Sequence, residues 1–442
     1  MKTVLIIGGG VAGYSLAIEL CKSFRVKIFE NKLIGGTCLN TGCIPTNFFT
    51  SKRDLISSVK TSSLFNIPEQ GIVDLKKLKT EKDEKIKKIR DSVISGLKKG
   101  GVEIIDGEAK LSGTKVIVDS VSFDGDIIVI ASGSIPANNT EIEADNKKIV
   151  SKSSDEFFNL EEFPEHLAII GAGYIGLEFA TVYNEFGSKV TIFEKSNSVL
   201  NDFEASTIKS LEARLKQQGI EIIKNALVKK INFDGTIEFE LNSKHSISNI
   251  FSHILFSTGR KPNIPEGLNA DLSEKGFVKV NEKFKTSIEN IYAIGDVIGT
   301  PFFAHRAGHQ AYLLSRIIKG ETVKSENLSL IPHVVFTHPE IAKIGFTEEE
   351  LKINNTDFEV YKIPYGVLGK SVILDETGQI KLIIDKRRII LGCVVIGKYA
   401  SELIGLISAL MSKGITIDEM KEITFPHPTF CEIFGEIVRR CC

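Results

Sequence analysis

Two short apolar runs, each followed at once by glycines, set the pattern of the chain. They cover residues 4–7 and 167–170. A helix-like apolar stretch follows each run, and then a second strand pattern that ends at Glu30 in the first copy and at Glu194 in the second. Strand, glycine turn, helix and strand in this order predict a Rossmann-like unit on a parallel sheet. The chain therefore contains two such units.

A long lysine-rich segment separates the two units. Over residues 74–99 the apolar side chains recur at helical spacing, which predicts one long amphipathic helix with the lysines on its solvated face. The apolar positions are Leu75, Leu78, Ile86, Ile89, Val93, Ile94 and Leu97.

The pattern changes again near Ile331 and predicts an antiparallel region. Strands are expected near 358–363, 380–384 and 389–396, followed by helices near 399–413 and 418–422. Ile433, Phe434, Ile437 and Val438 predict a last helix that packs on this region. Together the patterns predict an α/β fold class with two Rossmann-like dinucleotide-binding domains and a C-terminal α+β domain.

Composition restricts the classes of function. A chain of 442 residues is expected to form three or more domains. Its 55 Lys and Arg balance 56 Asp and Glu, so we expect no nucleic-acid partner and no charged membrane surface. No apolar run approaches the ~20 residues of a membrane span, and no signal-peptide pattern precedes the first strand. Seven scattered cysteines fit a reducing cytoplasm, where sulfur is catalytic rather than structural.

The glycines indicate dinucleotide binding. In each motif they allow a tight turn and bring the backbone close to a pyrophosphate at the positive end of a helix. The acidic residue that ends the next strand would accept a hydrogen bond from a ribose hydroxyl. The residues are Gly8, Gly10, Gly13 and Glu30 in the first motif and Gly171, Gly173, Gly176 and Glu194 in the second.

Cys38 and Cys43 follow the first motif after only a few residues. Two cysteines at this spacing near a helix start can close a small disulfide if the first turn is distorted, and such a ring is reducible. This layout is typical of a redox-active pair beside a bound cofactor. The alternatives are two buried cysteines or half of a zinc site, although no His/Cys pair with matching spacing occurs elsewhere and we expect no metal site.

The motif from Gly35 to Pro45, the two glycine motifs and the segment His427–Glu432 resemble the class I pyridine nucleotide-disulfide oxidoreductases. The resemblance runs from Val4 to Glu432 and is strongest to the dihydrolipoamide dehydrogenase type. It implies a FAD-binding domain that begins in residues 1–145 and is completed by 263–330, an NAD-binding domain in 146–262, and a dimerisation domain in 331–442.

The resemblance also assigns cofactor contacts. FAD would occupy the first site, and a nicotinamide dinucleotide the second. Further FAD contacts would be Gly36, Thr37, Gly107, Ser132, Gly133, Ser134, Asp296 and Ala304; further contacts in the second site would be Glu178, Val228 and Gly259. Because the Glu194 carboxylate would repel a 2′-phosphate, and Lys195 is a lone cation, we expect NAD(H) rather than NADP(H).

By the same resemblance, Cys43 is the thiol nearest the flavin and Cys38 the thiol that exchanges with substrate. His427, oriented by Glu432, would be the acid-base catalyst, since the reference pKa of histidine suits proton exchange with a thiol. It would serve the disulfide of the other subunit, so that the enzyme acts as a homodimer. His305, near the expected flavin, is a weaker candidate for a base.

Three features depart from the family pattern. Asn47 stands where relatives have a lysine that pairs with the glutamate at position 178. That carboxylate would lose a cation, so either its charge would be unbalanced or its pKa would be raised. The chain ends on Cys441 and Cys442, which either form a functional dithiol or, as we expect, an incidental exposed tail. The helix 14–20 lacks the arginine that binds glutathione in other relatives.

These features favour an apolar dithiol such as dihydrolipoamide as the substrate, with a lipoyl carrier protein as a partner. Two alternatives stay open. One is an NADH-dependent reductase of another disulfide or of a metal ion, similar to mercuric reductase. The other is a subunit that mainly docks within a larger dehydrogenase complex.

Overall fold

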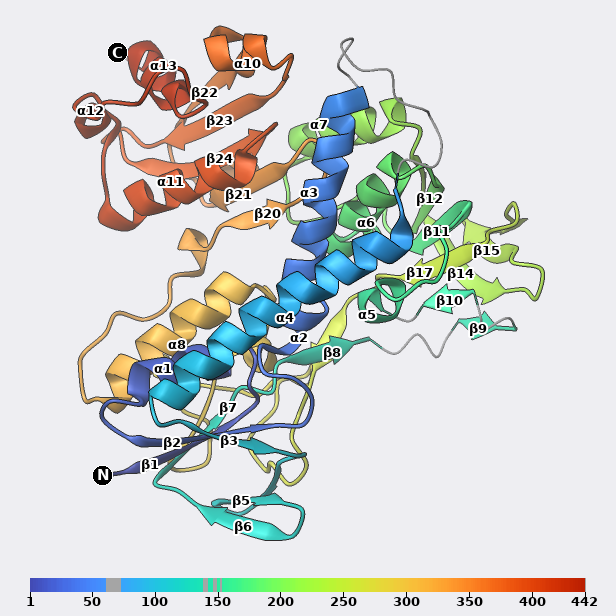
Figure 1. The fold of residues 1–442 in the computed structure, drawn as a ribbon. Helices are drawn as coiled ribbons and strands as arrows, with labels where there is room; N and C mark the ends of the chain where they lie inside the picture. The colour runs from blue at the N-terminus through green and yellow to red at the C-terminus, as the bar shows by residue number, and fades with distance from the viewer. Residues whose placement is uncertain (61–72, 138–141, 146–148, 152, 442) are drawn as a thin grey trace.

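The computed structural model describes residues 1–60, 73–137, 142–145, 149–151 and 153–441. Its three main sheets are a parallel sheet near the N-terminus, a second parallel sheet and a C-terminal antiparallel sheet (Figure 1). None of the helices in the described ranges is both long and apolar enough to span a bilayer.

The first parallel sheet has the strand order β19-β7-β1-β2-β3. Its strands are β1 (Thr3–Ile7), β2 (Arg25–Glu30), β3 (Glu103–Asp106), β7 (Ile127–Ile130) and β19 (Ile291–Ala293). Helices α1 (Val11–Leu20), α4 (Leu75–Lys99) and α8 (Ala304–Ile318) cover one face (Figure 1). Leu16, Leu97 and Leu314 from these helices are completely buried there. A three-stranded meander, β4 (Lys110–Ser112), β5 (Lys115–Val118) and β6 (Val121–Asp124), packs on the other face.

The second parallel sheet repeats this plan in the order β10-β17-β11-β12-β13. Its strands are β10 (Val150–Ser151), β11 (His166–Ile170), β12 (Lys189–Glu194), β13 (Glu221–Lys224) and β17 (His253–Phe256), with helices α5 (Ser154–Phe157), α6 (Tyr174–Glu185) and α7 (Ala205–Gln217). Two smaller sheets accompany it: β9 (Glu143–Ala144), β14 (Ala226–Ile231), β15 (Ile237–Leu241) and β16 (Lys244–Ile247), and the pair β8 (Ser134–Pro136) and β18 (Arg260–Pro262).

The antiparallel sheet has the order β20-β21-β24-β23-β22. Its elements are β20 (His333–Val335), β21 (Ile341–Gly345), α9 (Glu348–Ile353), β22 (Glu359–Pro364), α10 (Gly369–Ile373), β23 (Gln379–Ile384), β24 (Ile390–Ile396), α11 (Ala400–Lys413), α12 (Ile417–Met420) and α13 (Glu432–Arg440). Short 3-10 turns lie at η1 (Gly295–Ile298), η2 (Leu328–Leu330) and η3 (Tyr365–Val367). The predicted fold class is confirmed, including the last helix, whose four predicted apolar residues are buried.

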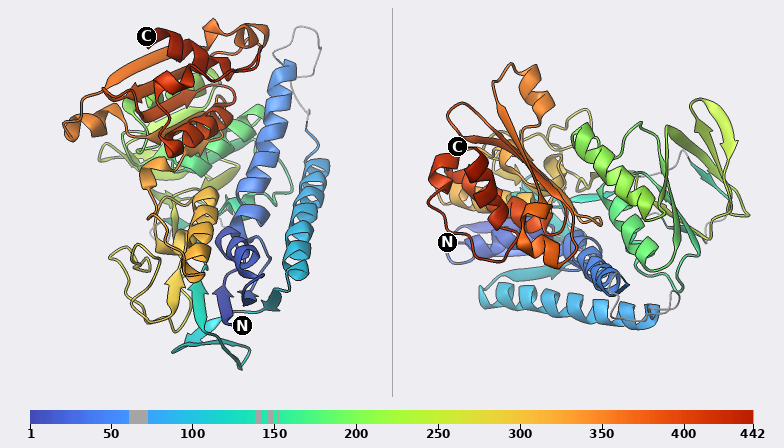
Figure 2. Two further views of the ribbon diagram at one scale, coloured as in Figure 1. Left: turned by 90° about the vertical axis from the view of Figure 1, so that its left-hand side faces the viewer. Right: turned by 90° about the horizontal axis from the view of Figure 1, so that it is seen from above.

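Two helices join the sheets. Helix α2 (Gly36–Asn40) follows the first glycine turn, and α3 (Cys43–Lys60) then runs about 27 Å toward α6 and the antiparallel sheet (Figures 1 and 2).

The long helix predicted over 74–99 is confirmed as α4, capped by the Asp74 side chain. The expectation that all its lysines are solvated is wrong for Lys82, which is buried against the ring of Phe158 and pairs with Asp83 at 3.0 Å.

A buried ion cluster ties the antiparallel sheet to the second dinucleotide unit. Lys381 of β23 contacts Glu204, which precedes α7, and its Nζ lies 2.8 Å from Glu348 Oε1 of α9. Lys381 and Glu204 are 5% and 6% exposed. Removing one partner of such a pair leaves a buried charge without compensation.

We therefore expect Lys381→Met to destabilise the protein by about 3 kcal/mol, the loss that is typical when one partner of a buried ion pair is removed. The control is Lys386→Met, because Lys386 pairs with Asp357 at the surface and both side chains are about three-quarters exposed. Thermal unfolding of the two variants measures the difference. Equal midpoints would show that the cluster does not hold the sheet in place.

Candidate functional site

Both glycine turns are built by close packing of helix against strand end. A Cβ on Gly13 would lie 1.9 Å from the Gly8 carbonyl oxygen, and one on Gly176 would lie 2.1 Å from that of Gly171. Any side chain at either position would push the helix away from the sheet. The third glycine of each motif is therefore required by packing.

The middle glycines leave space at the helix N-termini. Gly10 and Gly173 cap α1 and α6, and glycine offers no side chain to the first amides of either helix. A Cβ on Gly173 would meet nothing within 4 Å, and one on Gly10 would meet only Gly36 Cα, at 3.9 Å. Each turn thus presents backbone N–H groups and the positive end of a helix dipole to open space, which suits a pyrophosphate.

The two acidic residues at the strand ends adopt the same arrangement. Glu30 accepts hydrogen bonds from the backbone N–H of Gly9 at 2.7 Å and of Lys32 at 3.0 Å. Glu194 accepts from Ala172 at 2.7 Å and from Ser196 at 2.8 Å. These contacts fix each carboxylate beside its glycine turn. Because a carboxylate oxygen accepts more than one hydrogen bond, both can still receive ribose hydroxyls.

A polar cluster lies beside the first turn. Ser134 Oγ donates to Asp296 Oδ2 at 2.6 Å, and Arg260 Nε donates to Ser134 Oγ at 2.8 Å. Arg260 Nη2 also reaches Thr37 Oγ1, at 3.5 Å. Burial raises the pKa of Asp296. The sequence predicted Thr37, Ser134 and Asp296 but missed Arg260, which only the pairing of β8 with β18 brings here.

The remaining expected contacts are distributed over both units. Ser132 Oγ donates to the Asn263 carbonyl at 2.6 Å, Gly107 N–H donates to the Glu30 carbonyl at 3.0 Å, and Ala304 is the first residue of α8. Val228 is buried on β14, and Gly259 has a positive φ of 113° just before β18. His305 Nε2 lies 2.9 Å from the Pro332 carbonyl, and burial lowers the pKa of its ring, so it is held neutral.

The helix is interrupted between the two cysteines, as a disulfide of this spacing requires. Cys38 lies in α2 and Cys43 begins α3, with Thr41 and Gly42 between the helices. A Cβ on Gly42 would lie 3.0 Å from the Thr37 carbonyl oxygen, so a side chain would crowd this break. The Gly35 N–H donates to the Gly9 carbonyl at 2.8 Å, which ties the segment to the glycine turn.

In this structure the two cysteines are free thiols that share a hydrogen bond. That hydrogen bond raises the pKa of Cys38, as does burial, and it lowers the pKa of Cys43. The negative charge of Glu178 acts in the opposite direction on Cys43. These directions favour Cys43 over Cys38 as the sulfur that forms a thiolate.

His427 and Glu432 form the second reactive pair. His427 Nδ1 lies 2.7 Å from Glu432 Oε1, while Glu432 Oε2 accepts from the Thr429 N–H at 2.8 Å. These hydrogen bonds lower the pKa of Glu432. The His427 side chain is 77% exposed. With Nδ1 facing the carboxylate, Nε2 is directed away from it and is free to exchange a proton with a group outside this segment.

Comparison with protein families decides the assignment. Residues 2–311 match the model described as pyridine nucleotide-disulphide oxidoreductase, and residues 331–438 match the dimerisation domain of the same group. The chain belongs to the pyridine nucleotide-disulphide oxidoreductase family. The family resemblance found in the sequence is thereby confirmed, as are FAD and NAD(H) as the cofactors.

Individual relatives agree with this family. The chain is 32% identical to dihydrolipoyl dehydrogenase of Geobacillus stearothermophilus over 98% of this chain and 94% of the relative. It is 34% identical to dihydrolipoyl dehydrogenase of Buchnera aphidicola subsp. Schizaphis graminum, over 97% and 93%.

Solved structures show the same fold over the full length. LpdA from Mycobacterium tuberculosis superposes with a TM-score of 0.91 at 22% identity and complete coverage of both chains. The Cu(II) complex of the HOCl-induced flavoprotein disulfide reductase RclA from Escherichia coli has a TM-score of 0.86 at 26% identity over 99% of both chains.

The open glycine turns and the Asp296 cluster fit the dinucleotides of this family. In the first site, Gly10 and the start of α1 would hold the pyrophosphate of FAD, with Glu30 and Asp296 on its hydroxyl groups. Gly173 and Glu194 would take the corresponding parts of NAD(H).

One departure from the family changes the charge near the cysteines. Asn47 is exposed, while Glu178 of α6 accepts a hydrogen bond from the Phe336 N–H at 3.1 Å. Burial raises the pKa of Glu178 to about 7. The direction agrees with the sequence expectation, although the cause is burial rather than the missing lysine. The positive charge of Arg53, which the sequence analysis did not identify, opposes this increase.

The expectation that the C-terminal cysteines form an exposed tail is wrong for Cys441. Cys441 is not part of an exposed tail: it directly follows α13 as its C-cap and is 5% exposed, in the same buried core cluster as Val438. The short tail was expected to be exposed because nothing in the sequence shows that α13 extends its buried face to position 441. Cys442 lies outside the described residues.

The hydrogen bond between the two thiols yields a testable prediction. In the reduced protein, Cys38→Ser retains a donor to the Cys43 sulfur, whereas Cys38→Ala removes it. Because a donated hydrogen bond favours the thiolate, the pKa of Cys43 should be lower in Cys38→Ser than in Cys38→Ala. The measurement is a pH titration of thiolate ultraviolet absorbance, with the same variants carrying Cys43→Ser as baselines. A higher pKa in the serine variant would contradict the assigned roles.

Proposed function

We propose that this chain is a dihydrolipoamide dehydrogenase, which oxidises a small dithiol and reduces NAD⁺. The observation that carries the proposal is the pair of thiols of Cys38 and Cys43, set at a helix break directly beside a dinucleotide turn. The dihydrolipoyl dehydrogenases at 32–34% identity over nearly the whole chain support the choice of substrate. The reaction is dihydrolipoamide plus NAD⁺ giving lipoamide, NADH and H⁺.

The different pKa shifts of the two sulfurs would give them different roles. In the oxidised enzyme they form a disulfide, and a substrate thiolate attacks Cys38, so that Cys43 leaves as a thiolate. The second substrate thiol then attacks the mixed disulfide, closes the lipoamide ring and releases Cys38 as a thiol. A thiol of low pKa is the better leaving group, which suits Cys43. Bound FAD supplies the redox chemistry that passes the electron pair on to NAD⁺.

His427 would accept the proton of the substrate thiol, with Glu432 stabilising the charged ring. Its exposure and its place next to α13, within the matched dimerisation domain, support a homodimer in which it serves the cysteines of the partner subunit. A lipoyl group on a carrier protein is the corresponding partner. The division into residues 1–145, 146–262, 263–330 and 331–442 belongs to the same proposal.

A steady-state assay tests the substrate. The protein should turn over dihydrolipoamide with NAD⁺, and it should prefer NADH over NADPH by at least about tenfold in reducing lipoamide, because the Glu194 carboxylate repels a 2′-phosphate. Glu194→Gln should narrow that preference. Glu30→Gln is the matched control, since this residue has the same contacts in the other turn. Equal use of the two nucleotides would contradict the NAD(H) site.

The same assay addresses a second candidate function, reduction of a metal ion or of another disulfide. The 26% identity to a flavoprotein disulfide reductase solved with Cu(II), together with the exposed Asn47, favours including it. Cu(II), Hg(II) and oxidised glutathione should each be reduced by NADH more slowly than lipoamide. Faster turnover of Cu(II) or Hg(II) would replace the proposed function with metal reduction.

The acid-base pair can be tested against the C-terminal cysteine. His427→Gln should lower lipoamide turnover by on the order of a hundredfold, as expected for a lost acid-base group. His245→Gln is the matched control, since His245 is an exposed histidine on β16. Cys441→Ala should keep turnover within about twofold, because the side chain is buried in the core and cannot relay electrons. Loss of activity in Cys441→Ala alone would indicate a C-terminal relay.

A further inference from the structure

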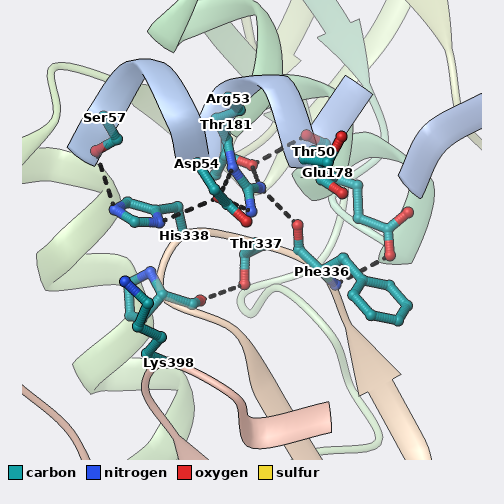
Figure 3. Close-up of polar contacts among 12 residues, drawn as sticks. Thr50, Arg53, Asp54, Ser57, Glu178, Thr181, Phe336, Thr337, His338 and Lys398 are labelled. Carbon is teal, nitrogen blue, oxygen red and sulfur yellow. Dashed lines mark hydrogen bonds and ion pairs between the residues drawn. The ribbon is translucent and has the colours of Figure 1, made fainter. Parts of the chain in front are cut away.

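Arg53 is a buried cation on the helix that carries Cys43. It is 1% exposed and lies six residues beyond Asn47, or about 9 Å further along α3. Its guanidinium makes contacts in three directions (Figure 3). Nη1 donates to Thr181 Oγ1 at 2.9 Å and to the Phe336 carbonyl at 2.6 Å, while Nε and Nη2 lie 2.8 and 2.7 Å from Asp54 Oδ1.

Two of these contacts lead to Glu178. The Phe336 residue that accepts from Arg53 through its carbonyl donates its own N–H to Glu178 Oε1 at 3.1 Å. Thr181, held by the same Nη1, donates its hydroxyl to the Glu178 carbonyl at 3.0 Å. Arg53 therefore reaches both the carboxylate and the backbone of Glu178 through one intermediate residue each.

The charges around Glu178 come from few elements. Helix α3 contributes the positive charge of Arg53 and the sulfur of Cys43, and the charge of Glu178 tends to raise the pKa of that sulfur. The segment after β20 contributes the Phe336 N–H, which donates to the carboxylate. On its own helix, Tyr174 has a pKa raised by burial, by Asp202 and, least, by Glu178. Arg53 is thus the cation that faces this carboxylate within the described residues.

A second ring of groups faces Arg53. Asp54 forms an ion pair with Arg53, and His338 Nδ1 lies 3.7 Å from Asp54 Oδ1. Burial and the charge of Arg53 lower the pKa of His338, so this ring stays neutral near pH 7 and does not replace Arg53 as the partner of Asp54. Ser57 Oγ lies 3.3 Å from His338 Nε2 and holds the ring (Figure 3).

We propose that Arg53 is a positioning residue for Glu178: it holds Phe336 and Thr181 against this glutamate and supplies the positive charge that residue 47 lacks. The proposal rests on the proposed function, since it concerns the carboxylate beside the expected flavin. Asn47 is exposed and uncharged, so the charge is delivered from further along the same helix. Lysine in place of arginine could not make all three contacts, because its ammonium is a compact point charge.

The test is a pH titration of the Glu178 carboxyl by infrared difference spectroscopy of the FAD-loaded protein, with Glu178→Gln identifying the band. Arg53→Met should raise the titration midpoint by about half a pH unit or more, because loss of a nearby cation favours the protonated carboxyl. Asp54→Asn should lower it, because Arg53 then acts without its counterion; Asp54 is 47% exposed, so this variant keeps the test open if Arg53→Met does not fold.

Two further variants complete the design. Lys52→Met removes the neighbouring cation of α3, which pairs with Glu81 at 2.9 Å, and should leave the midpoint unchanged. Adding Asn47→Lys to Arg53→Met should restore the parent midpoint or lower it further. In stopped flow, the pH profile of flavin reduction by NADH should shift with the infrared midpoint.

An unchanged midpoint in Arg53→Met or Asp54→Asn, or an equal shift in Lys52→Met, would overturn the proposal. The titration needs no substrate. Failure to turn over lipoamide would therefore count against the proposed function alone, and an unshifted Glu178 against Arg53 alone.

Discussion

Three parts of the chain are held together by contacts with the buried guanidinium of Arg53. It joins the helix that begins at Cys43 to α6 of the second dinucleotide unit and to the segment between β20 and β21 of the antiparallel sheet (Figure 3). A charge that is 1% exposed is tolerated only when its hydrogen bonds are made, and Asp54, Thr181 and Phe336 make them. The orientation of α3, and with it the position of Cys43, depends on this arrangement.

Much of the fold and of the site follows from local sequence signals. Both glycine turns and the carboxylates of Glu30 and Glu194 depend on residues close together in the chain, so spacing alone predicts them. The spacing of the two cysteines indicated a distorted helix start only on the condition that they form a disulfide. Arg53 could not be found this way. It lies between Lys52 and Asp54 in a run that is typical of a solvated surface, and its acceptor, Phe336, is 283 residues away.

The wrong expectations have the same origin. Lys82 belongs to a lysine-rich helix, but the position at which Phe158 meets that helix is set by tertiary packing. The ammonium of a lysine can lie over an aromatic ring, as that of Lys82 does over Phe158. Cys441 was expected to be exposed because it is near the end of the chain, yet α13 continues its buried face to that residue. Sequence periodicity identifies an apolar face better than it identifies what that face meets.

The two dinucleotide units differ most in what returns to the glycine turn. After β2 the chain comes back so that the Gly35 N–H donates to the Gly9 carbonyl at 2.8 Å; after β12 the Leu200 N–H donates to the equivalent carbonyl of Ala172 at 3.3 Å. The first return delivers Cys38 to the first turn. The second delivers Asp202, which bonds Tyr174 Oη at 2.6 Å and His333 Nδ1 at 2.8 Å.

The same kind of backbone hydrogen bond therefore brings different side chains to two equivalent positions. In the first unit the returning segment brings Cys38, one of the two thiols of the proposed redox pair. In the second it brings a carboxylate that anchors Tyr174, at the start of α6, to His333 of β20. Glu178 lies one turn beyond Tyr174 on α6, between that anchor and Thr181, which Arg53 contacts. The glutamate beside the cysteines is thus positioned by both the antiparallel sheet and the helix that carries Cys43.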